Sequence, residues 1–300
     1  MFDRRTLHGA YFALTAYGFW GLAPIYFKFL AHVSPLEILC HRVVWSVFLL
    51  LGILTYMGDM SALRIGKRKL GLCLLTALLL SANWLIFISA IVDNRIVEAS
   101  LGYFINPLVS VFLGMIFLRE TLRPMQWLAV AIAAMGIAYQ VVTLGVLPWI
   151  SLSLAFSFGF YGLIRKRMNL HPVAGLTIET LMMLPPALLF LGWLYANGEM
   201  SFAQVDTKTS LLLMLGGIIT SFPLLCFGAA VGRLSLTAVG MFQYLAPSLT
   251  LIVAVGIYAE TFSINRQITF GLIWLALLVF SFEAFHYHRR INRRLKNNLL

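Results

Sequence analysis

Apolar residues follow one another in ten long segments of this 300-residue chain, and most charged residues lie between the segments. Each segment is close to the roughly 20 residues that a helix needs to cross the hydrocarbon core of a bilayer. Because backbone groups in lipid must be hydrogen-bonded within the segment, we interpret each one as a membrane-spanning helix. The predicted spans are His8–Leu30, Leu36–Met57, Leu70–Val92, Glu98–Leu118, Pro124–Thr143, Pro148–Ile164, Val173–Ala196, Ser210–Ala230, Leu236–Tyr258 and Gln267–Tyr287.

One stretch of this pattern occurs twice. Ser81–Thr121 recurs without insertion as Ser221–Thr261, with seven identical positions at an offset of 140 residues. A shorter echo pairs Gly18–Gly21 with Gly159–Gly162. The sequence therefore predicts a five-helix repeat over 8–143, a second over 148–287 and a basic tail over 288–300. A membrane protein made of two such halves is most simply interpreted as a transporter.

Composition and charge support this interpretation. Hydrophobic residues make up 61% of the chain and charged residues 11%, beyond what a soluble domain can keep out of water. With the amino terminus in the cytoplasm, 17 of the 22 Lys and Arg residues lie on that side. Arg95, Lys208 and Arg266 lie outside, and Lys28 and Arg42 lie within spans. This is the positive-inside pattern with both termini cytoplasmic, so the net charge of +11 indicates no nucleic acid. An odd number of spans per half predicts that the halves are inverted.

Charged residues inside spans are the first candidates for function, since each costs about 2.5 kcal/mol or more unless it is paired or faces water. In this topology Glu37 and Glu98 lie near the outer interface, with Arg42 about 9 Å deeper. Arg42 can reach toward Glu98 or a backbone carbonyl, or it can face a water-filled cavity. Its role is then a structural ion pair, a direct contact with substrate or a gate, or simple snorkelling. We expect Glu37 and Glu98 to take part in structural ion pairing, and His41 to make a local hydrogen bond.

Glu179 is the deepest acidic residue of the second half. A carboxyl at that depth is desolvated, which favours the protonated form that proton coupling requires. The alternative is a hydrogen-bonded structural carboxyl that faces another helix.

Prolines and polar residues inside spans point to a central solute pathway. Pro107, Pro223 and Pro247 interrupt helical hydrogen bonding at related positions of the two halves, and broken helices can expose carbonyls to a solute. Kinks that serve packing alone are equally common. The predicted pathway residues are Trp20, Arg42, Asn83, Trp84, Tyr103, Asn106, Tyr161, Gln243 and Tyr244.

The sequence contains no motif for a nucleotide, a metal or another cofactor. It has no Gly-x-x-x-x-Gly-Lys-[Ser/Thr] run, no His-Glu-x-x-His pair and no Gly-x-Ser-x-Gly elbow, so neither ATP-driven transport nor an intramembrane enzyme is expected. The expected partners are a small-molecule substrate and membrane lipids. The oligomeric state is open between a monomer and a homodimer. The expected function is secondary transport by alternating access, with proton coupling open. The alternatives are a facilitative uniporter without ion coupling and a sensor or assembly partner without transport.

Several motifs resemble the EamA family of the drug/metabolite transporter superfamily. They include GMIFLRE from Gly114 to Glu120 and, at the corresponding helix end, GIYAE from Gly256 to Glu260. The run EASLGYFINP from Glu98 to Pro107 is similar to the RarD-like branch. The resemblance covers about Gly9 to Phe285. It implies ten helices in two inverted halves, a central cavity lined mainly by helices one to four and six to nine, and a bacterial inner membrane. By analogy it also implies export of a small metabolite.

Overall fold

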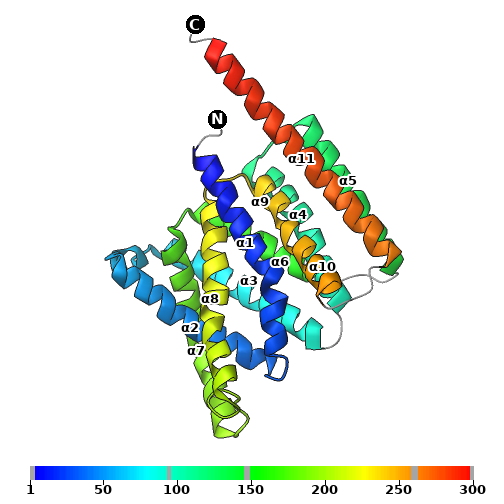
Figure 1. Cartoon of the computed structure of the whole chain (residues 1–300). Coiled ribbons are helices and arrows are strands. Elements are labelled where there is room, and N and C mark those ends of the chain that lie inside the picture. Colours follow the sequence, from blue (N-terminus) through cyan, green and yellow to red (C-terminus); the bar gives the residue numbers. More distant parts are fainter. Residues whose placement is uncertain (1–3, 93–95, 145–148, 258–262, 298–300) are drawn as a thin grey trace.

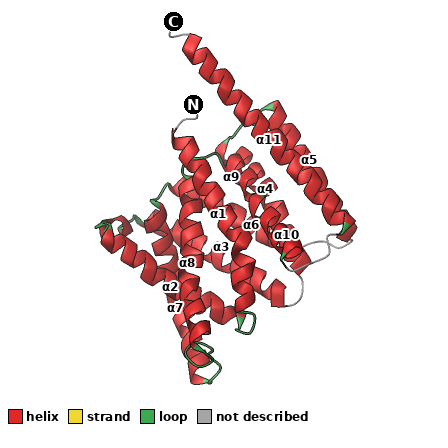
Figure 2. Cartoon of the chain, viewed as in Figure 1, coloured by secondary structure: helices red, strands yellow, loops and turns green. Residues whose placement is uncertain are grey.

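The computed structural model describes residues 4–92, 96–144, 149–257 and 263–297. Within these ranges the chain is helical apart from short turns and loops, and no strand is found there (Figure 2). The elements are α1 (Arg4–Phe29), α2 (Pro35–Tyr56), the short 3₁₀ helix η1 (Met60–Leu63), α3 (Lys67–Val92), α4 (Ile96–Leu118), α5 (Pro124–Leu144), α6 (Trp149–Met168), α7 (Pro172–Ala196), α8 (Thr207–Val231), α9 (Leu236–Gln243), α10 (Leu245–Gly256) and α11 (Ile264–Asn297).

This element order confirms the predicted all-α membrane fold. In the described ranges, seven segments are long and apolar enough to cross a bilayer: α2, α3, α5, α7, α8, the α9–α10 pair and α11. The other predicted spans correspond to α1, α4 and α6. The last helix continues past the predicted end at Tyr287 to Asn297, so the helix extends into the predicted basic tail.

The helices are arranged in pairs that mix the two predicted repeats. In Figure 1, α5 and α11 lie side by side at one edge of the molecule, and α2 and α7 lie together at the opposite edge. Between them α1 packs on α8 and α10, while α6 packs on α3 and α4. The described chain begins and ends at the same end of this bundle (Figure 1). Most long-range contacts of α1 and α6 are therefore made with helices of the other repeat.

The ninth predicted span is divided in two. Helix α9 ends at Gln243 and α10 begins at Leu245, and the Tyr244 amide bonds to the Met241 carbonyl in a tighter turn. Pro247 has no N–H to donate to the Gln243 carbonyl four residues earlier, which explains a distortion at this place. The break was predicted, although the span around it was drawn as one helix.

The other two predicted breaks do not occur. Helix α4 continues through Pro107, and α8 continues through Pro223. A single proline removes one backbone hydrogen bond, and the turns on either side keep theirs. At Pro107 the neighbouring helix also packs closely, since a Cβ added to Gly240 of α9 would lie 2.9 Å from the Pro107 carbonyl oxygen.

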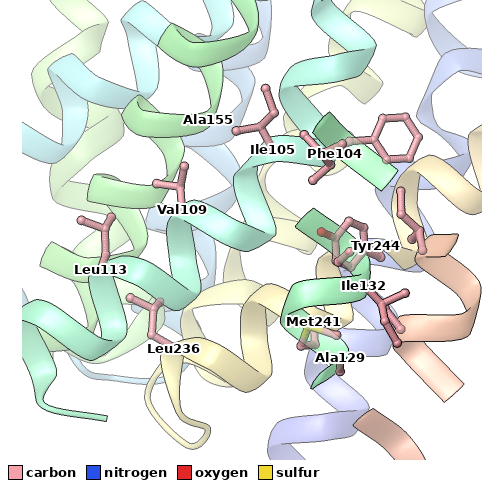
Figure 3. Close-up of a cluster of buried hydrophobic side chains, with 14 of the residues drawn as sticks. Phe104, Ile105, Val109, Leu113, Ala129, Ile132, Ala155, Leu236, Met241 and Tyr244 are labelled. Carbon is pink, nitrogen blue, oxygen red and sulfur yellow. The ribbon is translucent and has the colours of Figure 1, made fainter. Parts of the chain in front are cut away.

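A buried apolar cluster around α4 forms one core of the bundle. It joins α4 to α5, α6, α9 and α11, and Figure 3 shows the α4 side chains between those of the neighbouring helices. The members labelled there are Phe104, Ile105, Val109, Leu113, Ala129, Ile132, Ala155, Leu236, Met241 and Tyr244. Burying apolar surface against protein adds little hydrophobic driving force in lipid, so close packing itself holds these helices together.

Glu120 caps the first turn of α9 from the loop after α4. Its Oε1 accepts a hydrogen bond from the Leu236 amide at 2.6 Å, and its Oε2 accepts from the Thr237 amide at 2.9 Å and the Thr237 hydroxyl at 2.8 Å. The Ser235 hydroxyl accepts from the Ala238 amide. These first amides have no partner within their helix, and a carboxylate there also faces the positive end of the helix dipole. Glu120 therefore caps this helix from a neighbouring loop.

We predict that Glu120→Ala destabilises the protein by about 1–3 kcal/mol, because two amides lose their acceptor. Glu120→Gln keeps one acceptor oxygen and should cost less. Thermal unfolding of the detergent-purified protein measures both, with the exposed Glu199→Ala as matched control. If Glu120→Ala unfolds at the same temperature as the Glu199 variant, the cap contributes nothing to stability.

Candidate functional site

Arg42 is a buried cation at a junction between the two predicted repeats. It lies about 10 Å along α2 from Pro35, and only 8% of its surface is exposed. Its Nε donates a 2.7 Å hydrogen bond to Oγ1 of Thr220 on α8. This bond joins a helix of the first repeat to a helix of the second.

Aromatic rings from two further helices adjoin the guanidinium group. Its central carbon lies 4.6 Å from the ring centroid of Trp84 on α3 and 5.4 Å from that of Phe27 on α1. Gly216 of α8 leaves room for this arrangement, because a Cβ there would lie 2.9 Å from Arg42 Cγ and 3.0 Å from the Tyr26 hydroxyl. Side chains of α1, α2, α3 and α8 thus meet at Arg42.

The charge of Arg42 is only partly compensated by these contacts. Among the side chains that the structure describes, no carboxylate forms an ion pair with it. The predicted partner Glu98 lies outside the described side chains, so that pair stays a prediction. A ring face attracts a cation by about 0.5–2 kcal/mol, whereas a charged side chain inside the bilayer costs about 2.5 kcal/mol or more. The rings lower the cost of burying this cation without neutralising it.

Glu37 uses its carboxylate to hold the loop between α7 and α8. The fully buried side chain accepts hydrogen bonds at Oε1 from the backbone amides of Ser201 at 2.7 Å and Phe202 at 3.0 Å. His41 Nε2 is 3.9 Å from the same oxygen, too long for the expected hydrogen bond, and its ring stacks at a tilt on Phe202 with centroids 4.7 Å apart. Ion pairing of Glu37 is thus limited in the described chain to His41, and only when His41 is protonated.

Glu179 is the centre of a second buried polar cluster. Its Oε1 accepts a 2.7 Å hydrogen bond from Thr76 Oγ1 of α3 and lies 3.4 Å from Nη1 of Arg165 on α6. Its Oε2 accepts a 3.3 Å hydrogen bond from the Tyr161 hydroxyl. Side chains from both repeats therefore surround this carboxylate, and it has a buried cation as a partner.

Arg165 is the functional candidate that the sequence analysis missed. It was counted among the loop cations, but α6 continues to Met168 and the side chain turns into the bundle, 4% exposed. Gly175 of α7 makes room, since any side chain there would overlap the guanidinium group. A signal existed in the sequence: the short connection between α6 and α7 places Arg165 and Glu179 on facing helices.

The other polar residues predicted for the pathway lie at helix contacts. The Asn83 amide of α3 donates to the Leu154 carbonyl at 3.0 Å and to Ser157 Oγ at 2.9 Å, both on α6. Asn106 accepts a 3.5 Å hydrogen bond from Ser110 within α4. Gln243 is buried at the end of α9, beside the helix break. Asn83 thus links two helices of different repeats.

Most of the predicted aromatic lining is packed core. Trp20 and Tyr161 belong to one cluster around Phe227, where the Tyr161 and Phe227 rings stack with centroids 5.8 Å apart. Tyr244 is fully buried in the cluster of Figure 3. Tyr103, by contrast, is 38% exposed and meets the Phe87 ring edge-on. The structure therefore brings Trp84 to Arg42, buries Tyr161 and Tyr244 in the packed interior, and packs the half-buried Trp20 against the same core.

A cavity of about 500 Å³ opens at the end of the bundle where the chain begins. It is lined by Arg5, Asn169, Leu170, His171, Pro172, Gly228, Gly232 and Arg233. None of the predicted pathway residues lines it. A central cavity around Arg42 thus remains a prediction from the family resemblance.

Comparisons with known proteins establish the family. Residues 7–142 match the model of the EamA-like transporter family. An "Uncharacterized transporter" of Vibrio cholerae is 49% identical over 280 residues, 92% of either chain. Protein RarD of Escherichia coli is 43% identical over 293 residues, 97% of this chain and 99% of its own. A known crystal structure with a TM-score of 0.71 covers 93% of this chain and 98% of its own; at 21% identity, it shows the fold alone. This chain is therefore a multi-pass membrane protein of the RarD-like branch of the EamA-like transporter family.

Proposed function

We propose that this protein is a secondary transporter that carries a small organic solute across the bacterial inner membrane by alternating access. The observation that carries the proposal is the buried guanidinium of Arg42, bonded across the two repeats to Thr220. A cation held at that depth needs a function or a partner. A solute that binds there contacts both halves of the molecule at once.

Two polar clusters join the halves at different depths of the bundle. The Arg42–Thr220 bond connects α2 to α8, and the Thr76–Glu179 bond connects α3 to α7. Arg42 lies about 10 Å from the start of α2, and Thr76 lies about 14 Å from the start of α3. These two helices start at opposite ends of the bundle. Alternating access requires contacts between the halves that exchange as the pathway opens to one side and then the other. These two bonds are the contacts that we propose to exchange.

An inverted relation of the two repeats is part of this proposal. The packing supports a two-fold relation between the repeats, because exchanging each helix with its counterpart maps one observed contact onto another. The pair α1–α8 corresponds to α6–α3, and α1–α10 corresponds to α6–α4. With both termini in the cytoplasm, a five-helix half would face opposite ways in its two copies.

The alternatives differ in what moves across the membrane. A sensor or assembly partner moves no solute, and a facilitator moves solute only down its gradient. An enzyme is disfavoured by the missing catalytic motifs and by the transporter names of the relatives. We propose export as the direction, by analogy with exporters of the EamA family.

Transport itself is tested with proteoliposomes that are loaded with a bacterial metabolite extract. We expect mass spectrometry to show that some compounds leave vesicles containing the protein and stay in protein-free vesicles. Compounds that leave at equal rates in both would contradict transport and favour the sensor or assembly role.

The topology gives a separate prediction. The loop around Val205 should be outside and the Met60 segment inside, and both side chains are exposed. The native residues Cys40, Cys73 and Cys226 are buried. In intact cells, a membrane-impermeant thiol reagent should therefore label Val205→Cys and leave Met60→Cys and the wild type unlabelled. The reverse pattern would overturn the orientation.

Glu179 gives the prediction on energy coupling. If protons drive transport through this carboxylate, Glu179→Gln should abolish accumulation against a gradient and keep downhill exchange, because the amide keeps the shape and loses the titration. The comparison uses a solute identified by the proteoliposome assay, with and without a pH gradient. Glu37→Gln is the matched control, since that carboxylate is also buried but holds a loop.

Two outcomes would remove Glu179 from coupling. A Glu179→Gln variant that still concentrates solute in response to the pH gradient would assign a structural role to the Arg165 pair. A wild-type protein that ignores the gradient would be a facilitator.

A further inference from the structure

We propose that Arg42 binds the anionic head of the substrate, and that the substrates are organic carboxylates with an apolar body. This inference rests on the proposed transport function and adds the chemical class of the solute. It follows from the hydrogen bonding, the charge and the surroundings of this one side chain.

The orientation of the guanidinium group leaves one of its edges without a hydrogen-bond partner among the described residues. Thr220 donates its hydroxyl proton to the Gly216 carbonyl at 2.7 Å, so an oxygen lone pair receives the Nε proton of Arg42. The edge formed by Nη1 and Nη2 makes no hydrogen bond to any residue that the structure describes. Two parallel N–H groups at this edge match the two oxygens of a carboxylate.

The charge balance points to the same ligand. Among the described residues, the buried carboxylates are Glu37 and Glu179. Glu37 binds the loop amides, and Glu179 pairs with Arg165. Neither forms an ion pair with Arg42. An anionic solute would neutralise a buried cation, whereas a cationic solute would add a second like charge in a low-dielectric site.

The surroundings indicate an apolar body behind the anionic head. The neighbouring rings of Trp84 and Phe27 are only half-buried, so part of each ring is open to a neighbouring molecule. Sites for small molecules are mostly lined by apolar and aromatic groups, with few polar groups that fix the orientation. Here Arg42 supplies the polar contact and the rings supply the apolar one.

The experiment uses the purified full-length protein and matched sets of probes. Each set has one aryl or alkyl carrier with a carboxylate, a primary amide or an amine, such as 3-phenylpropionate, 3-phenylpropionamide and 3-phenylpropylamine. Binding is read from tryptophan fluorescence, because Trp84 adjoins the site, and from the thermal shift of unfolding. We expect the acids to bind and the amides and amines not to bind. Phenylphosphonate tests the head group, and binding of phosphonates alone would overturn the carboxylate class.

Variants separate the role of Arg42 from general stability. Arg42→Gln should weaken acid binding about 10- to 100-fold, the loss of a charge-assisted pair of hydrogen bonds. Arg42→Lys keeps the charge without the planar fork and should lie in between. The exposed Lys208→Gln removes a cation elsewhere and should bind as the wild type does. If Arg42→Gln does not fold, the test is the difference in affinity between acid and amide probes. This difference should be large in the wild type and smaller in Arg42→Lys.

Glu98→Gln tests whether the chain neutralises its own cation. Acid binding that stays the same in this variant supports the proposal. Acid binding that appears only in this variant would show that Glu98 occupies Arg42 in the wild type, which overturns it. Equal binding of acids and amides, or no acid binding in any set, would also overturn the proposal.

The outcomes also separate this inference from the proposed function. If the proteoliposomes release only cationic or neutral compounds, the protein is a transporter and the carboxylate class is wrong. If acids bind through Arg42 while no compound is released, the site exists and transport is wrong.

Discussion

The cost of placing a charge inside a bilayer governs the arrangement of this protein. Two buried carboxylates, Glu37 and Glu179, meet this cost by accepting hydrogen bonds from groups fixed elsewhere in the bundle, and the half-buried loop residue Glu120 binds in the same way. Glu120 binds the first amides of α9, Glu37 binds two loop amides, and Glu179 binds Thr76, Tyr161 and Arg165. Because their donors lie on other elements, the carboxylates also fasten the helices to one another. Charge burial thereby becomes a means of joining the two repeats.

Small residues make these polar contacts geometrically accessible. Gly217 brings α8 against the backbone of α2, where an added Cβ would lie 2.6 Å from the carbonyl carbon of Trp45. Gly175 admits the guanidinium group of Arg165, and Gly216 admits the stem of Arg42. In lipid, close backbone approach and interhelical hydrogen bonds drive helix association, because the hydrophobic effect contributes little there. The same glycines that pack the helices therefore determine where the charged side chains can lie.

The sequence predicts the helices well because their signal is local. Segment length and hydropathy are enough for the spans, and the doubled plan that the 140-residue repeat suggests stays a prediction. The exceptions, the turn at Tyr244 and the continuous helices at Pro107 and Pro223, depend on how each backbone is packed. Pattern alone carries no information on that packing.

The site was predicted only in part, and for a physical reason. Depth in a span identified Arg42 and Glu179, because an intramembrane charge is rare and costly. Partners are a property of tertiary contacts, so the sequence does not predict the Thr220 bond, and the short α6–α7 connection brings Arg165 and Glu179 onto facing helices without fixing that their side chains pair. Arg165 was missed because a basic residue at a helix end is ordinarily a loop cation. Only the facing Gly175 and Glu179 turn it inward.

The two cations that are buried in the described part of the chain differ in a way that bears on function. Arg165 faces a carboxylate of the chain and forms a neutral unit with it, so its cost is met whether or not a solute is present. Arg42 has ring faces and one hydroxyl as its described partners, and none of these carries a negative charge. An anion bound at Arg42 would give this site the neutrality that the Glu179 cluster already has. The free energy of that neutralisation would be available only when solute is bound, and a ligand shifts a conformational equilibrium only through such a difference in binding free energy.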